Sequence, residues 1–142
     1  EVWKNLIFQL GEVSSTLKPD VIVGIEARGF IVGSALATKQ GIGFVPIRKK
    51  GKLPGETNQM SYELEYGTDS LEIQKDSLTK DSRVLIVDDL LATGGTIKAT
   101  CNLVKKSGAN VVGVAVLMEL TNLNGRQLID RNIPINSIIA YH

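Results

Sequence analysis

The sequence has little of several things, and each shortage narrows what the protein can be. It has one cysteine, Cys101, which excludes an internal disulfide framework and is typical of a reducing cytoplasm. Its net charge is only +1, so overall charge gives no reason to expect a nucleic-acid partner. No apolar run is long enough to cross a bilayer, and the first residues lack the pattern of a secretory signal. With one histidine, His142, there is no Cys and His cluster to suggest zinc.

What is present indicates one domain over residues 1–142, with 43% hydrophobic residues for its core. Apolar residues three or four apart, and small apolar segments closed by glycine, predict helices at 2–17, 29–41, 94–108 and, as a short one, near 123–131. Short apolar and β-branched runs predict strands at 21–25, 43–49, 83–89, 110–120 and 136–142. Pro46 argues for an edge or an irregular position in its strand.

The alternation of strands and helices predicts an α/β fold with a mainly parallel central sheet flanked by helices. Residues 51–61 are rich in glycine and polar residues and are expected to form an exposed loop, with a hairpin beyond it. Ligands bind such sheets at the carboxyl ends of the strands. The segments that begin there are "GIEARG", "IRKKGK", "VDDLLATGGT" and "MELTN".

The segment "VLIVDDLLATGGT" combines two carboxylates with a loop of small residues at the start of a helix. Asp88 and Asp89 can accept hydrogen bonds from hydroxyls or bind a metal, whereas the backbone N–H groups and hydroxyls of residues 93–96 can bind a phosphate. This combination suits a ribose phosphate, and the alternative is a plain strand end, polar turn and helix cap. A P-loop and a Rossmann dinucleotide site are excluded, because neither glycine pattern is present.

Basic residues follow two other strands and suit a more highly charged anion such as pyrophosphate. Arg28 stands between a strand and a helix and could bind a phosphate in bidentate fashion; the alternative is a surface arginine paired with Glu26. The second group, which we call the cationic cluster, is either an anion site or a solvated run of charge. It consists of Arg48, Lys49, Lys50 and Lys52.

The long segment from Gly51 to about Lys75 is either a lid over the site or a plain insertion. Glu65 and Tyr66 are its candidate chemical residues, although the sequence pattern alone would not single them out.

These motifs together resemble those of the type I phosphoribosyltransferases. "VLIVDDLLATGGT" is similar to their phosphoribosyl-pyrophosphate signature, and "GIEARGF", "IRKKGKLPGET", "SYELEYGTDSLEIQKD" and "MELTNLNGR" look like the adenine-specific members. The resemblance implies transfer of ribose 5-phosphate from phosphoribosyl pyrophosphate to adenine, giving AMP and pyrophosphate. Residue by residue, it implies ribose contacts from Asp88 and Asp89 and a 5-phosphate site formed by Ala92, Thr93, Gly94, Gly95 and Thr96.

For the remaining roles, the resemblance implies that Arg28, Arg48, Lys49 and Lys52 bind pyrophosphate, and that Glu65, Tyr66 and Arg28 are catalytic. Mg²⁺ is expected to bind through the substrate, with Asp88 as a candidate ligand. The resemblance also implies a cis peptide bond between Glu26 and Ala27, a flexible catalytic loop and a cytoplasmic homodimer. Residues 117–122 are expected to supply part of the wall that faces the base.

In this family a hood over the base precedes the first helix, and we expect it to be absent from this chain. Two alternatives follow: a transferase for another base, such as hypoxanthine or guanine, and a non-catalytic regulator that binds a phosphoribosyl ligand with the same fold.

Overall fold

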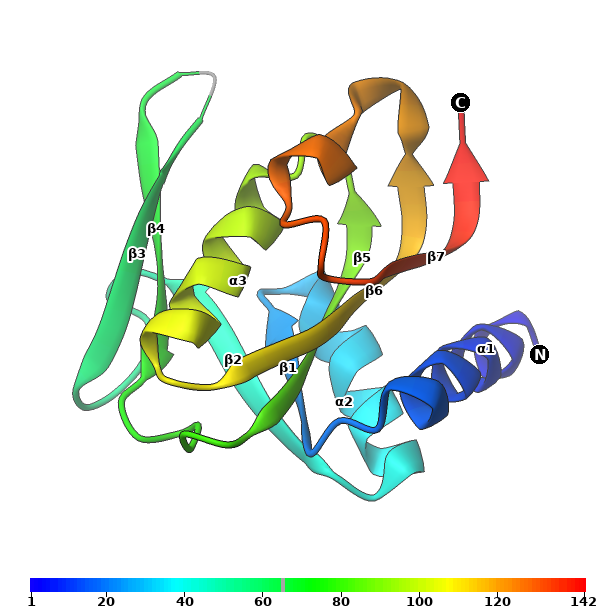
Figure 1. Ribbon diagram of the computed structural model, residues 1–142, viewed down its shortest axis with the longest axis horizontal. Coiled ribbons are helices and arrows are strands. Elements are labelled where there is room, and N and C mark those ends of the chain that lie inside the picture. The colour runs from blue at the N-terminus through cyan, green and yellow to red at the C-terminus, as the bar shows by residue number, and fades with distance from the viewer. Residues whose placement is uncertain (65) are drawn as a thin grey trace.

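The computed structural model describes residues 1–64 and 66–142, which form a seven-stranded sheet with helices on both faces (Figure 1). The order of the strands across the sheet is β3-β4-β2-β1-β5-β6-β7. Their bounds are β1 Val21–Ile25, β2 Gly43–Lys49, β3 Thr57–Glu63, β4 Thr68–Gln74, β5 Arg83–Leu91, β6 Asn110–Leu120 and β7 Ile135–Tyr141. The helices are α1 Val2–Leu17, α2 Arg28–Gln40 and α3 Gly95–Lys106, with short 3₁₀ helices η1 Thr121–Leu123 and η2 Gly125–Leu128.

The central strands pair in parallel, as predicted, and only β3 and β4 run antiparallel to their neighbours. β2 pairs with β1 along residues 43–47, whereas only Arg48 and Lys49 pair with β4 on its other side. Pro46 therefore lies where the strand has a partner on one side, as its lack of an N–H donor requires. The carboxyl ends of β1, β2, β5 and β6 meet at one edge of the sheet.

Alternation along the buried strands divides the core between the two faces of the sheet. Ile22 and Leu85 pack with α1 and α2, whereas their neighbours Val23 and Ile86 pack with α3. Cys101 on α3 is 3% exposed and belongs to the α3 side, and burial raises the pKa of its thiol to about 11. The cysteine is a packing residue, as expected. No helix within the described part of the chain is long and apolar enough to span a membrane.

One sequence prediction of local structure is wrong, and a second is correct only in part. The segment 51–61 is not all loop, because β3 begins at Thr57 and pairs with β4 along its whole length. Met60 and Tyr62 alternate with exposed residues and pack against the core, which is the pattern of a half-buried strand. The short helix expected near 123–131 is instead the pair η1 and η2, separated by Asn124 in the left-handed conformation with φ of 54°.

Candidate active site

The loop from Ala92 to Thr96, which we call the phosphate loop, joins β5 to α3 at the carboxyl edge of the sheet. Gly94 has φ of 92° and immediately precedes α3, so this position favours glycine. The first N–H groups of an α-helix have no acceptor within the helix and carry its positive dipole end. Residues 88–97 and Arg28 line a cavity of about 190 Å³ at this point. A small cavity at a helix start, lined in part by small residues and hydroxyls, suits a phosphate group.

Two adjacent carboxylates lie beside this cavity, in the last part of β5. Arg28 Nε forms an ion pair with Asp89 Oδ2 at 2.7 Å. Arg28 is therefore paired with Asp89, and the alternative pairing with Glu26 is wrong. Burial, together with the neighbouring Asp89 carboxylate, raises the pKa of Asp88 to about 7. A strongly shifted carboxyl in a hollow is typical of a functional site.

The start of α2 comes close to β5 because Gly29 has no side chain. A Cβ atom at Gly29 would lie 3.1 Å from Asp88 Oδ1 and 3.1 Å from the carbonyl oxygen of Val87. This close approach brings Arg28, the first residue of α2, to the aspartates. The peptide bond between Glu26 and Ala27 is cis, as the family resemblance implied.

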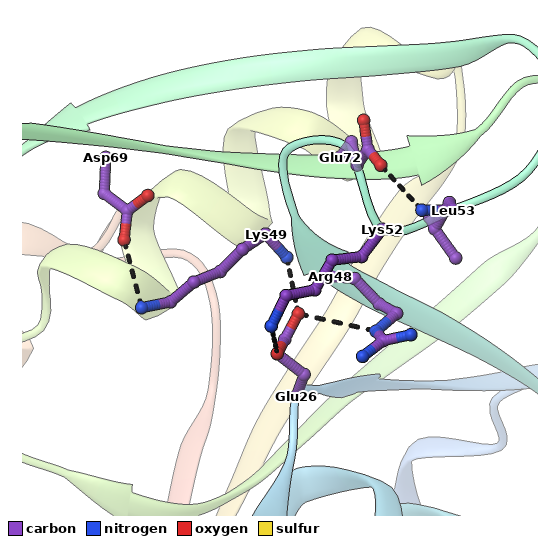
Figure 2. Close-up of polar contacts among 7 residues, drawn as sticks. All are labelled: Glu26, Arg48, Lys49, Lys52, Leu53, Asp69 and Glu72. Carbon is purple, nitrogen blue, oxygen red and sulfur yellow. Dashed lines mark hydrogen bonds and ion pairs between the residues drawn. The ribbon is translucent and has the colours of Figure 1, made fainter.

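The cationic cluster is organised around an internal carboxylate, that of Glu26 (Figure 2). This side chain is 10% exposed and accepts hydrogen bonds from the Lys49 backbone N–H at 2.7 Å and Lys52 Nζ at 2.8 Å. Arg48 Nε lies 3.4 Å from the same carboxylate. Burial opposes the charge of Glu26, but the hydrogen bonds from Lys52 and the Lys49 N–H outweigh it, so its pKa lies below the usual range. A run of merely solvated charges would not show this arrangement.

Two further residues, Asp69 and Phe30, contact the side chains of Lys49 and Arg48 in the cationic cluster. Lys49 Nζ lies 3.3 Å from Asp69 Oδ2 on β4, and this pairing raises the lysine pKa (Figure 2). The Arg48 guanidinium lies 5.9 Å from the centre of the Phe30 ring, within range of a cation–π contact. Lys50 is exposed.

A second buried acid, Glu72, holds the turn that carries Lys52. Its side chain is on β4, and the residue is 2% exposed. It accepts hydrogen bonds from the backbone N–H of Leu53 at 2.9 Å and the Thr57 hydroxyl at 3.1 Å. Burial opposes the charge, but these bonds and those from the N–H groups of residues 51 and 52 keep its pKa below the usual range. Lys52 is therefore positioned from both sides of the turn.

A larger cavity, of about 560 Å³, adjoins the phosphate loop. It shares Arg28, Asp88, Asp89 and Thr96 with the smaller cavity. Its other polar lining residues include Glu26, Lys49, Tyr62 and Asp69. The structure thus brings together the aspartates, the phosphate loop, Arg28 and Lys49 around connected hollows.

Some residues do not join this arrangement. Tyr66 is 88% exposed in the turn between β3 and β4 and lines neither cavity. Glu65 lies outside the described residues. A further hollow of about 650 Å³ lies between α1 and α2 near Trp3 and Phe8, and it shares no lining residue with the other two.

Sequence reasoning missed Glu26, Asp69 and Glu72 as members of the site. Glu72 stands between the buried residues Leu71 and Ile73, so strand alternation would place it in water. The turn at residues 51–53 covers it instead. The one signal available was the excess of basic residues in "IRKKGK", which calls for acidic partners in a chain that is otherwise near neutral.

The residues present fit a magnesium ion held mainly by substrate. Among the residues that the structure describes, no three His, Cys, Asp or Glu side chains form a group that could hold a metal. Mg²⁺ is usually bound by one or two carboxylates together with substrate phosphates. Asp88 and Asp89 are carboxylates of this kind beside the phosphate loop.

An acidic pair followed by a glycine-rich anion loop, at the carboxyl edge of a parallel sheet, defines a protein that binds a sugar phosphate. The family model for the "Phosphoribosyl transferase domain" matches residues 4–135. An adenine phosphoribosyltransferase of Prochlorococcus marinus (strain MIT 9313) is 55% identical over 139 residues, which are 98% of this chain and 81% of the relative. The chain therefore belongs to the phosphoribosyltransferase family, among its adenine phosphoribosyltransferases, as the sequence motifs implied.

Solved structures agree with this assignment. The adenine phosphoribosyltransferase of Thermoanaerobacter pseudethanolicus superimposes with a TM-score of 0.94 at 51% identity, covering 97% of this chain and 80% of that one. The enzyme of Saccharomyces cerevisiae, complexed with an imino-altritol bisphosphate and adenine, gives a TM-score of 0.85 at 45% identity over 92% and 73% of the two chains. The enzyme of Trypanosoma brucei, in complex with AMP, pyrophosphate and ribose-5-phosphate, gives 0.90 at 31% identity over 99% and 64%.

Proposed function

We propose that this protein is an adenine phosphoribosyltransferase, which transfers ribose 5-phosphate from phosphoribosyl pyrophosphate to adenine and releases AMP and pyrophosphate. The observation that carries the proposal is the convergence of the aspartate pair, the phosphate loop and Arg28 on connected cavities. Relatives that are 50–55% identical over nearly the whole chain are adenine phosphoribosyltransferases, which supports adenine as the base.

Each half of the phosphoribosyl substrate has a matching half of the site. In the proposed complex, the amides and hydroxyls of the phosphate loop donate hydrogen bonds to the 5-phosphate. Asp88 and Asp89 accept hydrogen bonds from the ribose hydroxyls. Arg28 and the cationic cluster bind the pyrophosphate.

The reaction breaks the bond between the ribose carbon and the pyrophosphate oxygen and forms a bond from that carbon to a nitrogen of adenine. The ribose acquires cation-like character on the way, as in glycoside cleavage. Arg28 and Lys52 would stabilise the negative charge that develops on the leaving group. Carboxylates beside the ring would stabilise the developing positive charge. We keep Glu65 and Tyr66 as candidate residues of the covering loop.

We also propose that Mg²⁺ binds together with the pyrophosphate and that the Asp88 carboxylate is its candidate protein ligand. When bound, the ion would neutralise the phosphate oxygens of the leaving group.

A homodimer is a further proposal, supported by exposed apolar side chains on α1 and α2 that include Val2, Phe8 and Ile31. Sedimentation analysis would test it. The buried, lone Cys101 supports a cytoplasmic location.

The function is tested by mixing the full-length protein with adenine, phosphoribosyl pyrophosphate and Mg²⁺ and measuring AMP by chromatography. We expect AMP to form with adenine and to stop forming when the metal is chelated, and we expect no IMP from hypoxanthine and no GMP from guanine. Asp88→Asn and Thr93→Ala should each slow the reaction, and unchanged rates would contradict the site. Binding of substrate without any turnover would favour a regulator. Turnover with another base would show that this base, and not adenine, is the substrate.

A further inference from the structure

The motif "MELTNLNGR" begins in the last residues of β6, at the same edge of the sheet, and lines neither cavity of the site. Its glutamate, Glu119, is 6% exposed. Both of its oxygens accept hydrogen bonds from Arg126, each at 2.8 Å, and Oε1 also accepts one from the Ser137 hydroxyl at 3.0 Å. The hydrogen bonds from Arg126 hold the pKa of Glu119 below its usual range. This bidentate pair ties η2 to the ends of β6 and β7.

The residue next to Arg126 is Gly125, and its backbone packs directly against the phosphate loop. A Cβ atom at Gly125 would overlap the carbonyl oxygen of Ala92 and would lie 3.2 Å from the backbone nitrogen of Gly94. Conversely, a Cβ atom at Gly94 would overlap the carbonyl oxygen of Gly125 and lie 3.1 Å from its Cα. No side chain separates the two backbones, so the position of η2 determines where the loop can lie.

The two glycines are required for different reasons. Gly94 has φ of 92°, a conformation that other residues rarely adopt. Gly125 begins a 3₁₀ helix, is buried, and has no such positive φ. At Gly125 the requirement is therefore one of space alone. The atoms that would have to move to admit a methyl group there include backbone atoms of the phosphate loop itself, and backbone yields less readily than the end of a flexible side chain.

We propose that Gly125 is a positioning residue for the 5-phosphate site, held against the phosphate loop by the Glu119–Arg126 pair. It lines neither of the site's cavities and acts only through the loop. The proposal rests on the proposed function, because it assumes that the loop binds the 5-phosphate. It explains why a motif outside both cavities accompanies the phosphate-binding signature: a site built from backbone amides depends on what fixes that backbone.

The test compares the binding of two ligands to the full-length protein by calorimetry. In Gly125→Ala, ribose 5-phosphate should bind about 10- to 100-fold more weakly, because the amides no longer converge on the phosphate. Pyrophosphate should bind as in the wild type, because its cationic residues are held by Asp89, Glu26 and Asp69, which lie outside η2. In turnover assays, the KM for phosphoribosyl pyrophosphate should rise while the KM for adenine changes little.

A control is Gly113→Ala, which also places a methyl group in a crowded position, on β6. There the nearest atom is Leu17 Cδ1, at 2.6 Å from the added Cβ, on the side of the sheet covered by α1. We expect Gly113→Ala to lower the melting temperature without weakening ribose 5-phosphate binding. Equal loss of both ligands in Gly125→Ala, or selective loss in Gly113→Ala, would overturn the proposal.

A second variant covers the case in which Gly125→Ala fails to fold. Glu119→Gln keeps the shape of the side chain and weakens the pair with Arg126, so ribose 5-phosphate should bind severalfold more weakly and pyrophosphate equally well. Unchanged ribose 5-phosphate binding in Glu119→Gln would then overturn the proposal. If the wild-type protein itself binds neither ribose 5-phosphate nor AMP, the proposed function has failed instead.

Discussion

The phosphate loop and the cationic cluster lie at the same edge of the sheet and are predicted to bind anions, yet they are built differently. The phosphate loop carries no charged side chain, and its shape depends on glycines that let backbone approach backbone. The cationic cluster relies on long charged side chains, which the carboxylates of Glu26 and Asp69 hold in place. The first region therefore depends on steric fit, whereas the second depends on charge balance.

This difference has a consequence for how each region meets its ligand. Among the residues that the structure describes, no carboxylate accepts a hydrogen bond from the N–H groups of the phosphate loop, so these groups are ready for a phosphate. The cations of the cluster already pair with the Glu26 carboxylate. A bound pyrophosphate must therefore either bind the cations together with Glu26 or take its place as their partner. Salt and charge changes should therefore affect the cationic cluster, while small steric changes should affect the phosphate loop.

The largest effect is expected from Gly94→Ala, which adds a methyl group to the phosphate loop. We expect catalytic efficiency to fall about 100-fold, because the loop must move. The free energy of unfolding should fall by about 1–3 kcal/mol, because the left-handed conformation is unfavourable for alanine. Steady-state kinetics and denaturant unfolding measure both.

Gly95→Ala is the matched stability control, since its added Cβ would come no closer than 4.0 Å to the Tyr62 ring. It should leave the free energy of unfolding almost unchanged. Equal destabilisation by the two variants would show that neither the left-handed conformation of Gly94 nor its contact with Gly125 constrains the loop.

The next effect concerns pH and Asp88, which stands between the two regions. Its pKa is raised from 3.8 to about 7, so the folded chain holds this proton more tightly than the unfolded chain does. The stabilising contribution of the protonated carboxyl is complete below about pH 4 and is lost as the pH rises to about 7. We expect the free energy of unfolding of the wild type, measured relative to Asp88→Asn, to fall as the pH rises over that range.

Urea unfolding at several pH values would measure this difference. A constant difference between wild type and Asp88→Asn across the range would show that burial does not disfavour the Asp88 charge in solution.

A third change, Lys52→Ala, removes a cation from the cluster. The KM for phosphoribosyl pyrophosphate should rise about 10-fold, which corresponds to the loss of one charge-assisted hydrogen bond. The variant should also show a weaker dependence on salt than the wild type. Lys52→Arg is the control and should recover part of the affinity. If Thr93→Ala in the phosphate loop changed the salt dependence just as much, the contrast between the two regions would be lost.

The smallest effect is expected from Tyr66→Phe in the turn between β3 and β4. The side chain is 88% exposed, so the free energy of unfolding should change by less than about 0.5 kcal/mol. We expect kcat to fall a few-fold, because the residue is proposed to help cover the reacting centre. A normal kcat would remove Tyr66 from the candidate catalytic residues.

The sequence predicted those parts of the fold and site that are local. Runs such as "VIVGI" and "RVLIVDD" became buried parallel strands, because apolar, β-branched residues on both faces require cover on both sides. The phosphate loop was also predictable, because its glycines and hydroxyls are contiguous and closely follow the two aspartates of β5. Topology then placed Arg28 beside it.

The parts that could not be predicted are pairings between distant residues. Glu26 meets Lys52 and Glu119 meets Arg126 only once strands and turns are folded, and nothing in the local pattern selects the partner. The start of β3 was missed because glycine and polar residues before it masked the alternation of Met60 and Tyr62. The contact between Gly94 and Gly125 joins two backbones, so no side chain in the sequence indicates it.

The burial of Cys101 makes the protein convenient for site-specific spectroscopy. It is the one cysteine of the chain, and its raised pKa keeps the thiol protonated and unreactive near neutral pH. A cysteine introduced at Tyr66 would then react alone with a maleimide dye, without removal of the native thiol. A fluorophore at that position could report, in solution and in real time, whether the turn approaches the phosphate loop when ligand binds.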